Sequence, residues 1–196
     1  MSRQRRERQA ARQAGAGDAS RKVFRVIEAL LWVVVAGLFV WRITPQLRAA
    51  AGWGSGGTDA PAVTFQMLDG HAVPMRELRG QVVLVNFWAT WRPPCRAEMP
   101  GFQKVYESKR GDGFTVVGVS MDEAAPEHVA SFLRDHAIAY PVAMATPDVA
   151  AAFGGVNSFP TSFLIDRQGR VRYTVRGIFA SVTLRAAVDR LLAEGR

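Results

Sequence analysis

Residues 83–100 read VLVNFWATWRPPCRAEMP, and this stretch decides the fold of the chain. It begins inside a longer apolar run, Gln81–Trp88, that contains three valines. A continuous apolar run of this length indicates a central strand that is buried on both faces of a sheet. Pro93 and Pro94 follow after a gap of four residues, and proline is favoured in the first turn of a helix. The stretch therefore predicts a buried strand, a short loop and a helix, in that order.

The rest of the chain continues this alternation of strands and helices. Further strands are predicted at 62–68, 71–74, 114–120, 161–166 and 171–176, and further helices at 126–136, 148–153 and 181–192. Strands separated by helices imply parallel neighbours, whereas the turn at 166–169 is short enough to force antiparallel pairing. The predicted fold class is α/β, with a mixed sheet and helices on both of its faces.

Two separated segments resemble the signatures of membrane-anchored, thioredoxin-like proteins of the TlpA/ResA type, within the redoxin (AhpC/TSA-like) family. The first is residues 83–100, where those proteins usually read W-x-x-W-C-x-P-C. The second is Phe159–Asp166, FPTSFLID, which resembles the family's second signature and implies a cis-proline at Pro160. The resemblance runs from about Pro61 to the end of the chain, and it implies a thioredoxin-like fold.

The resemblance fails at one residue, because Arg92 stands where the family has its first cysteine. In the family motif that cysteine attacks a substrate disulfide, and its pKa is lowered by the helix N-terminus. The second cysteine then resolves the mixed disulfide. Cys95 is the only cysteine of this chain, and it matches the resolving position. The chain therefore cannot run a two-cysteine cycle alone.

The sequence leaves two interpretations open for Cys95. A lone cysteine on a packed helix is most often a small buried apolar residue. Alternatively, Arg92 and the helix N-terminus stabilise a thiolate that forms a mixed disulfide with a partner chain. Glu98 lies three residues further on and shares that face of the helix. The resemblance implies that the matching glutamate manages protons, while a solvated surface glutamate is the alternative.

The predicted substrate-binding residues are Trp91, Pro94, Phe159 and Pro160. The resemblance implies that Pro160 faces the active site and that Phe159 offers backbone groups to an extended peptide. Trp91 is expected to be exposed beside the motif, where an aromatic side chain supports contact with a partner. The implied partner is an extracytoplasmic polypeptide with a thiol or disulfide, such as an apocytochrome c or an oxidative-folding protein. No cofactor is predicted, and one cysteine with three scattered histidines predicts no metal site.

Three functional hypotheses follow, and the sequence does not decide whether the chain is an enzyme. The first is a thiol-disulfide oxidoreductase family member with altered, monothiol or lost redox activity. The second is a non-catalytic polypeptide-binding module that uses the groove beside Pro160. The third is a damaged or deliberate variant, since one base transition converts a cysteine codon into an arginine codon.

The positive charge of the chain is concentrated at its N-terminus. Of the net charge of +8, residues 1–22 carry seven basic residues against two acidic ones, and residues 44–196 carry only +2. A nucleic-acid-binding domain would carry such charge on its folded surface, so this class of partner is not expected. Residues 1–22 are predicted to be a basic, disordered cytoplasmic tail.

Residues 23–43 are predicted to form one transmembrane signal-anchor helix. The uninterrupted apolar core, 29–41, is short for a membrane span, but Arg25 and Arg42 can extend toward the two interfaces. A basic tail that stays in the cytoplasm places the C-terminal domain in the periplasm or another extracytoplasmic space. A cleaved signal peptide and a buried core helix are the alternatives. Residues 44–60 are predicted to be a flexible linker, and residues 61–196 the thioredoxin-like domain.

Overall fold

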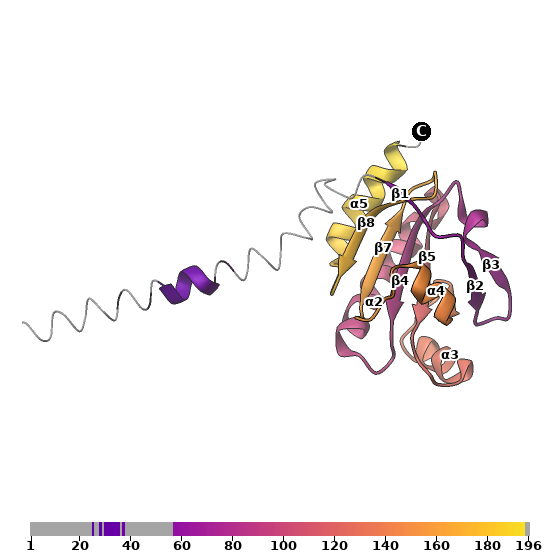
Figure 1. Ribbon diagram of the computed structural model, residues 1–196, viewed down its shortest axis with the longest axis horizontal. Helices are drawn as coiled ribbons and strands as arrows, with labels where there is room; N and C mark the ends of the chain where they lie inside the picture. The colour runs from indigo at the N-terminus through magenta and orange to yellow at the C-terminus, as the bar shows by residue number, and fades with distance from the viewer. Residues whose placement is uncertain (1–24, 26–27, 29, 36, 38–56, 195–196) are drawn as a thin grey trace, which may run out of the picture. The chain divides into compact units, whose positions relative to one another are not determined.

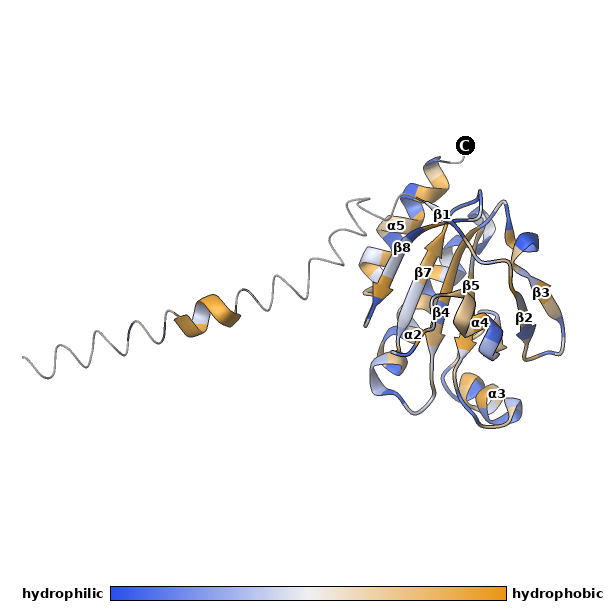
Figure 2. Cartoon of the chain, in the orientation of Figure 1, coloured by the Kyte–Doolittle hydropathy of each residue, from blue (hydrophilic) through white to orange (hydrophobic). Residues whose placement is uncertain are grey.

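The computed structural model describes residues 57–194, together with residues 25, 28, 30–35 and 37. The chain divides into two compact units, residues 1–44 and 45–196. In the first unit, residues 30–35 are helical and form a mainly hydrophobic segment (Figure 2). Their apolar side chains are 45–68% exposed. No helix within the described residues has the length and apolar character needed to span a bilayer. The predicted tail and much of the predicted anchor lie outside the described residues.

The second unit is built on a mixed sheet of eight strands in the order β1-β8-β7-β4-β5-β6-β2-β3 (Figure 1). The strands are β1 (Thr58–Asp59), β2 (Thr64–Met67), β3 (Ala72–Pro74), β4 (Val82–Trp88), β5 (Phe114–Ser120), β6 (Val142–Met144), β7 (Thr161–Ile165) and β8 (Arg170–Arg176). β4, β5 and β6 run parallel, and every other pairing is antiparallel. β4 is central and all seven of its side chains are buried, as its apolar run predicts.

Helices cover both faces of the sheet. The α-helices are α2 (Pro93–Lys109), α3 (Pro126–Asp135), α4 (Pro147–Ala152) and α5 (Ser181–Glu194), and the 3₁₀ helices are η1 (Met75–Leu78) and η2 (Arg110–Asp112). α2, α3 and α5 share one apolar core with Leu84 and Trp88 of β4. α4 and η1 share a second core with Val83, Val85 and Phe87 on the opposite face. The predicted mixed α/β sheet with helices on both faces is confirmed.

Three features of the sheet differ from the sequence prediction. β6 was not predicted, because a three-residue strand after Pro141 gives almost no periodic signal. β1 lies inside the segment predicted as a flexible linker, so residues 58–59 belong to the sheet. β7 pairs antiparallel with β4 instead of parallel to a neighbour. Its connection from β6 contains only the six-residue helix α4, about 9 Å long, which is too short to return along the sheet.

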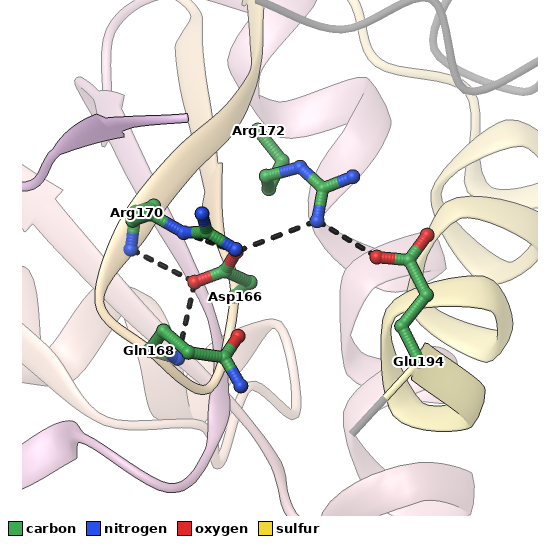
Figure 3. A network of polar contacts seen from close by, with 5 residues as sticks. All are labelled: Asp166, Gln168, Arg170, Arg172 and Glu194. Carbon is green, nitrogen blue, oxygen red and sulfur yellow. Dashed lines mark hydrogen bonds and ion pairs between the residues drawn. The ribbon is translucent and has the colours of Figure 1, made fainter. Parts of the chain in front are cut away.

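The end of the sheet away from the carboxyl end of β4 is fixed by a buried carboxylate (Figure 3). Asp166 is buried, and its Oδ1 accepts hydrogen bonds from the backbone N–H groups of Gln168 and Arg170 in the β7–β8 turn. Its Oδ2 lies 3.4 Å from an Arg172 guanidinium nitrogen, which also lies 2.7 Å from Glu194 of α5. This network ties the β7–β8 hairpin to the last turn of α5 at the end of the sheet opposite the carboxyl end of β4.

Candidate functional site

Four segments meet at the carboxyl end of β4: the loop after it, the first turns of α2, the residues before β7, and residues 177–179. Thr161 at the start of β7 pairs with Phe87 of β4. The backbone N–H of Gly177 donates to the carbonyl of Pro160 at 2.8 Å. The backbone N–H of Phe179 donates to Glu98 of α2 at 3.0 Å. The antiparallel direction of β7 therefore brings Pro160 to the beginning of α2.

Arg92 is the N-cap of α2, and its side chain makes no capping hydrogen bond. Arginine is a poor residue there, because short oxygen-bearing side chains are preferred at N-caps and a cation opposes the helix dipole. Its guanidinium instead lies 5.6 Å from the centre of the Phe159 ring, which is a cation–π distance. The helix still begins at Pro93, since Pro93 and Pro94 need no N–H partners.

Cys95 is fully buried, with 0% of its surface exposed. It belongs to the apolar core that contains Trp88 and Met99. Burial is the largest cause that raises the pKa of this thiol, to about 11; nearby Glu98 also raises it, and Arg92 lowers it to a smaller extent. At neutral pH the thiol therefore keeps its proton. The structure favours the interpretation of Cys95 as a small buried apolar residue.

We expect Cys95 to resist alkylation in the native protein, because its sulfur is covered and protonated. Iodoacetamide labelling at pH 7, read by mass spectrometry, should leave the native chain unmodified and should modify it once denaturant is added. Arg96→Cys is the matched control, since it places a thiol at an exposed position on the same helix. Stoichiometric labelling of the native wild type at the rate of that control would show that Cys95 is accessible.

Glu98 is buried as well, with 5% of its surface exposed. Its Oε1 accepts a hydrogen bond from Asn86 Nδ2 at 2.9 Å, and its Oε2 accepts the bond from Phe179. Burial raises the pKa of this carboxyl to about 8, although both hydrogen bonds oppose the change. The alternative of a solvated surface glutamate is therefore wrong, because Phe179 and Asn86 cover the helix face that Glu98 shares with Cys95.

The predicted aromatic surface is present. Trp91 is 62% exposed, and its ring meets the half-buried Phe159 edge to face at 6.2 Å between centroids. The peptide bond between Phe159 and Pro160 is cis, as expected. Pro160 is buried, whereas Pro94 is half-buried in the first turn of α2. Of the predicted binding residues, Trp91, Phe159 and Pro160 thus lie together, and Pro94 lies two residues along the helix from Arg92.

The sequence analysis missed a polar cluster that holds the loop after β4. Asp122 Oδ2 accepts hydrogen bonds from the Thr90 backbone N–H at 3.0 Å and from Ser120 Oγ at 2.7 Å. Asp122 Oδ1 also accepts a hydrogen bond from Thr90 Oγ1. The available signal was an acid two residues after the apolar strand 114–120, because side chains at the ends of adjacent parallel strands meet. The cluster anchors the residues just before Trp91 and Arg92.

Comparisons with known proteins identify the family of the chain. The model of the AhpC/TSA family matches residues 57–174. Thiol-disulfide oxidoreductase ResA of Bacillus thuringiensis (strain Al Hakam) is 33% identical over 115 residues, which are 59% of this chain and 66%, or just under two thirds, of that protein. ResA of Bacillus subtilis (strain 168) is 31% identical over 123 residues, which are 63% of this chain and 68% of that protein.

A solved structure gives the same result. A thiol:disulfide interchange protein of the thioredoxin family from Chlorobium tepidum TLS is 34% identical, with a TM-score of 0.65 over 70% of this chain and 98% of the other. The family model and the solved structure both agree with the thioredoxin-like fold of the second unit. The chain therefore belongs to the AhpC/TSA family, as a thioredoxin-like relative of ResA-type thiol-disulfide oxidoreductases.

Proposed function

We propose that this protein keeps the polypeptide-binding surface of a ResA-like domain but has lost the two-cysteine cycle. It binds a partner polypeptide without exchanging electrons with it. The observation that carries the proposal is the state of the motif: Arg92 occupies the N-cap, and the sole cysteine, Cys95, is fully buried. A guanidinium can neither attack a disulfide nor store reducing equivalents, and a buried, protonated thiol is a poor nucleophile.

The binding half of the site supports the same proposal. Trp91 remains exposed beside Phe159. The hydrogen bond from the Gly177 N–H to the Pro160 carbonyl holds residues 177–179 next to Pro160. An exposed tryptophan beside a second aromatic ring forms the kind of apolar surface that interfaces use. The partner that the family resemblance suggests is an extracytoplasmic polypeptide, for example an apocytochrome c or a protein of oxidative folding.

Insulin reduction with dithiothreitol tests the loss of the redox cycle. The wild-type chain should give the uncatalysed rate, because a single buried thiol cannot complete thiol–disulfide exchange. Cys95→Ser should give the same rate within error. Wild-type catalysis that disappears in Cys95→Ser would instead identify a monothiol enzyme and overturn the proposal.

We also propose that residues 23–43 anchor the chain in the cell membrane, with the N-terminus cytoplasmic and the C-terminal domain outside the cytoplasm. The exposed apolar side chains of residues 30–35 support it, because water is a poor environment for six such neighbours. The seven basic residues of the tail support the direction.

Alkaline phosphatase fused after residue 60 tests this topology, since the enzyme needs disulfides that form outside the cytoplasm. The fusion should be active, and deletion of residues 23–43 should abolish its activity. The mass of the mature chain should include the N-terminal tail; a chain that begins near residue 52 would identify a cleaved signal peptide instead. An inactive full-length fusion would contradict the extracytoplasmic location.

A further inference from the structure

We propose that the surface around Arg92 selects extended polypeptide segments that carry an acidic side chain two residues away from an apolar one. This inference rests on the proposed function and adds the chemistry of the bound segment. The surface consists of Trp91, Arg92, Phe159 and Ile178, which we call the rim.

The apolar half of the rim comes from residues that are exposed although they are large and apolar. Across residues 57–194 the exposed large apolar side chains are Trp91, Ile178 and Val182. Ile178 is 48% exposed and directly follows Gly177, whose N–H is bonded to Pro160. Trp91 packs against Phe159, which directly precedes Pro160 in the chain. Trp91 and Ile178 thus both lie near Pro160, and two exposed apolar side chains close together favour contact with an apolar side chain of a partner.

The cationic half of the rim is the Arg92 guanidinium. It lies over the Phe159 ring, and no carboxylate of the described residues forms an ion pair with it. Its planar fork of N–H donors suits a carboxylate, and hydrogen bonds between two charged groups are the strongest in proteins. The cation–π contact with the ring restricts the guanidinium, so less conformational freedom is lost when it binds.

The helix itself cannot replace Arg92 as the anion-binding group. Pro93 and Pro94 have no N–H, and the N–H groups of Cys95 and Arg96 already donate to the carbonyl of Arg92, at 3.0 and 3.3 Å. The first turn of α2 therefore offers no free backbone donor among these four residues. Among the rim residues, Arg92 is the one that can hydrogen-bond an acidic group, so a single substitution removes that contact.

The acids near the rim do not cancel its positive charge. Glu98 is buried with a raised pKa of about 8, so it is largely neutral at pH 7. Asp122 accepts hydrogen bonds from Thr90 and Ser120, which do not remove its charge, but it is a single acid against Arg92 and Arg96. Arg96 adds a second cation one turn further along α2, over the Phe132 ring at 5.9 Å. The local charge is complementary to an acidic segment.

The spacing follows from the geometry of an extended chain. Residues i and i+2 point to the same side, about 6.6 Å apart. The corresponding distances on the rim are similar: 5.6 Å from the Arg92 guanidinium to the Phe159 ring, and 6.2 Å from that ring to Trp91. An acidic residue on Arg92 and an apolar residue two positions away on the aromatic rings can be bound together.

Fluorescence anisotropy with labelled, cysteine-free decapeptides tests the proposal on the full chain in detergent. The peptides are capped at both ends and differ only at their centre, which reads Glu-Ser-Leu, Gln-Ser-Leu, Lys-Ser-Leu or Glu-Ser-Ser. The wild type should bind Glu-Ser-Leu about tenfold more tightly than each of the other three, a difference of about 1.4 kcal/mol. The preference for glutamate should shrink as salt rises from 50 to 500 mM.

Matched variants separate the possible outcomes. Arg92→Gln should bind Glu-Ser-Leu and Gln-Ser-Leu equally, whereas Arg110→Gln, an exposed arginine of η2, should keep the wild-type ratio. Trp91→Ala should weaken the binding of all leucine peptides without changing that ratio. If the four peptides bind the wild type equally and Trp91→Ala weakens them all, polypeptide binding stands and the selection of acidic segments is refuted. If no peptide binds the wild type, both proposals fail.

Discussion

Replacing Arg92 with cysteine should convert the protein into a disulfide reductase. The new thiol would stand at the N-cap of α2, three residues before Cys95, where a helix N-terminus lowers a thiol pKa. Residues i and i+3 of a helix lie one turn apart on the same face, and Cys-x-x-Cys pairs at this spacing close disulfides. The thiolate at position 92 would attack a substrate disulfide and release one thiolate. Cys95 would then attack the mixed disulfide, release the second thiolate and close an internal disulfide that dithiothreitol reduces.

The measurement is the rate of insulin reduction with dithiothreitol as electron donor. We expect Arg92→Cys to exceed the wild-type rate by at least about tenfold, because its thiolate fraction near neutral pH is far larger than that of a buried thiol. Arg96→Cys is the matched control: it adds an exposed thiol to the same helix without the i, i+3 spacing, so it should stay near the wild-type rate. If folded Arg92→Cys is as inactive as the wild type, the arginine at position 92 is not the sole cause of the lost reductase activity.

The second large effect is the pH dependence of stability that Glu98 causes. The folded protein holds this proton up to about pH 8, whereas the unfolded chain releases it near 4.5. The folded state therefore binds more protons between these values, and stability falls as the pH rises through that window. The contribution is complete below pH 4.5, is lost progressively up to about pH 8, and totals about 3–5 kcal/mol.

Urea unfolding at several pH values between 4.5 and 8.5 measures this effect, with the helical circular dichroism signal as the probe. The wild-type free energy of unfolding should decrease across the range, and Glu98→Gln should remove most of that slope because glutamine does not titrate. Glu127→Gln, an exposed glutamate in the first turn of α3, should keep the wild-type slope. An identical slope in Glu98→Gln would show that Glu98 is not the group that causes the dependence.

The fold was predictable where one segment carried its own signal. β4 is a continuous apolar run, and α2 begins with two prolines, so both could be placed from local sequence. The direction of β7 could not be predicted from local sequence. It depends on the length of α4, which connects β6 to β7, and β6 itself is only three residues long. The same direction places Pro160 beside α2, so an incorrect topology would have misplaced the binding surface.

The sequence could place the candidate residues on their helix and strands, but it could not give their environments. The spacing of Cys95 and Glu98 places both on one helix face, yet it does not say what covers that face. The cover comes from Phe179, 81 residues away, and from Asn86, so Glu98 is buried and hydrogen-bonded. The contact made by Arg92 could likewise not be predicted from local sequence. Its guanidinium lies over the ring of Phe159, which is 67 positions further along the chain.

The central claim is that the protein binds polypeptide without sulfur chemistry. Its most direct measurement compares two forms of one unfolded, cysteine-containing polypeptide, one with free thiols and one blocked with iodoacetamide, in titrations against the full chain. The account predicts equal affinities for the two forms, weaker binding of both by Trp91→Ala, and no change in Cys95→Ser. Binding that requires free thiols or disulfides, is released by dithiothreitol and disappears in Cys95→Ser would contradict the account.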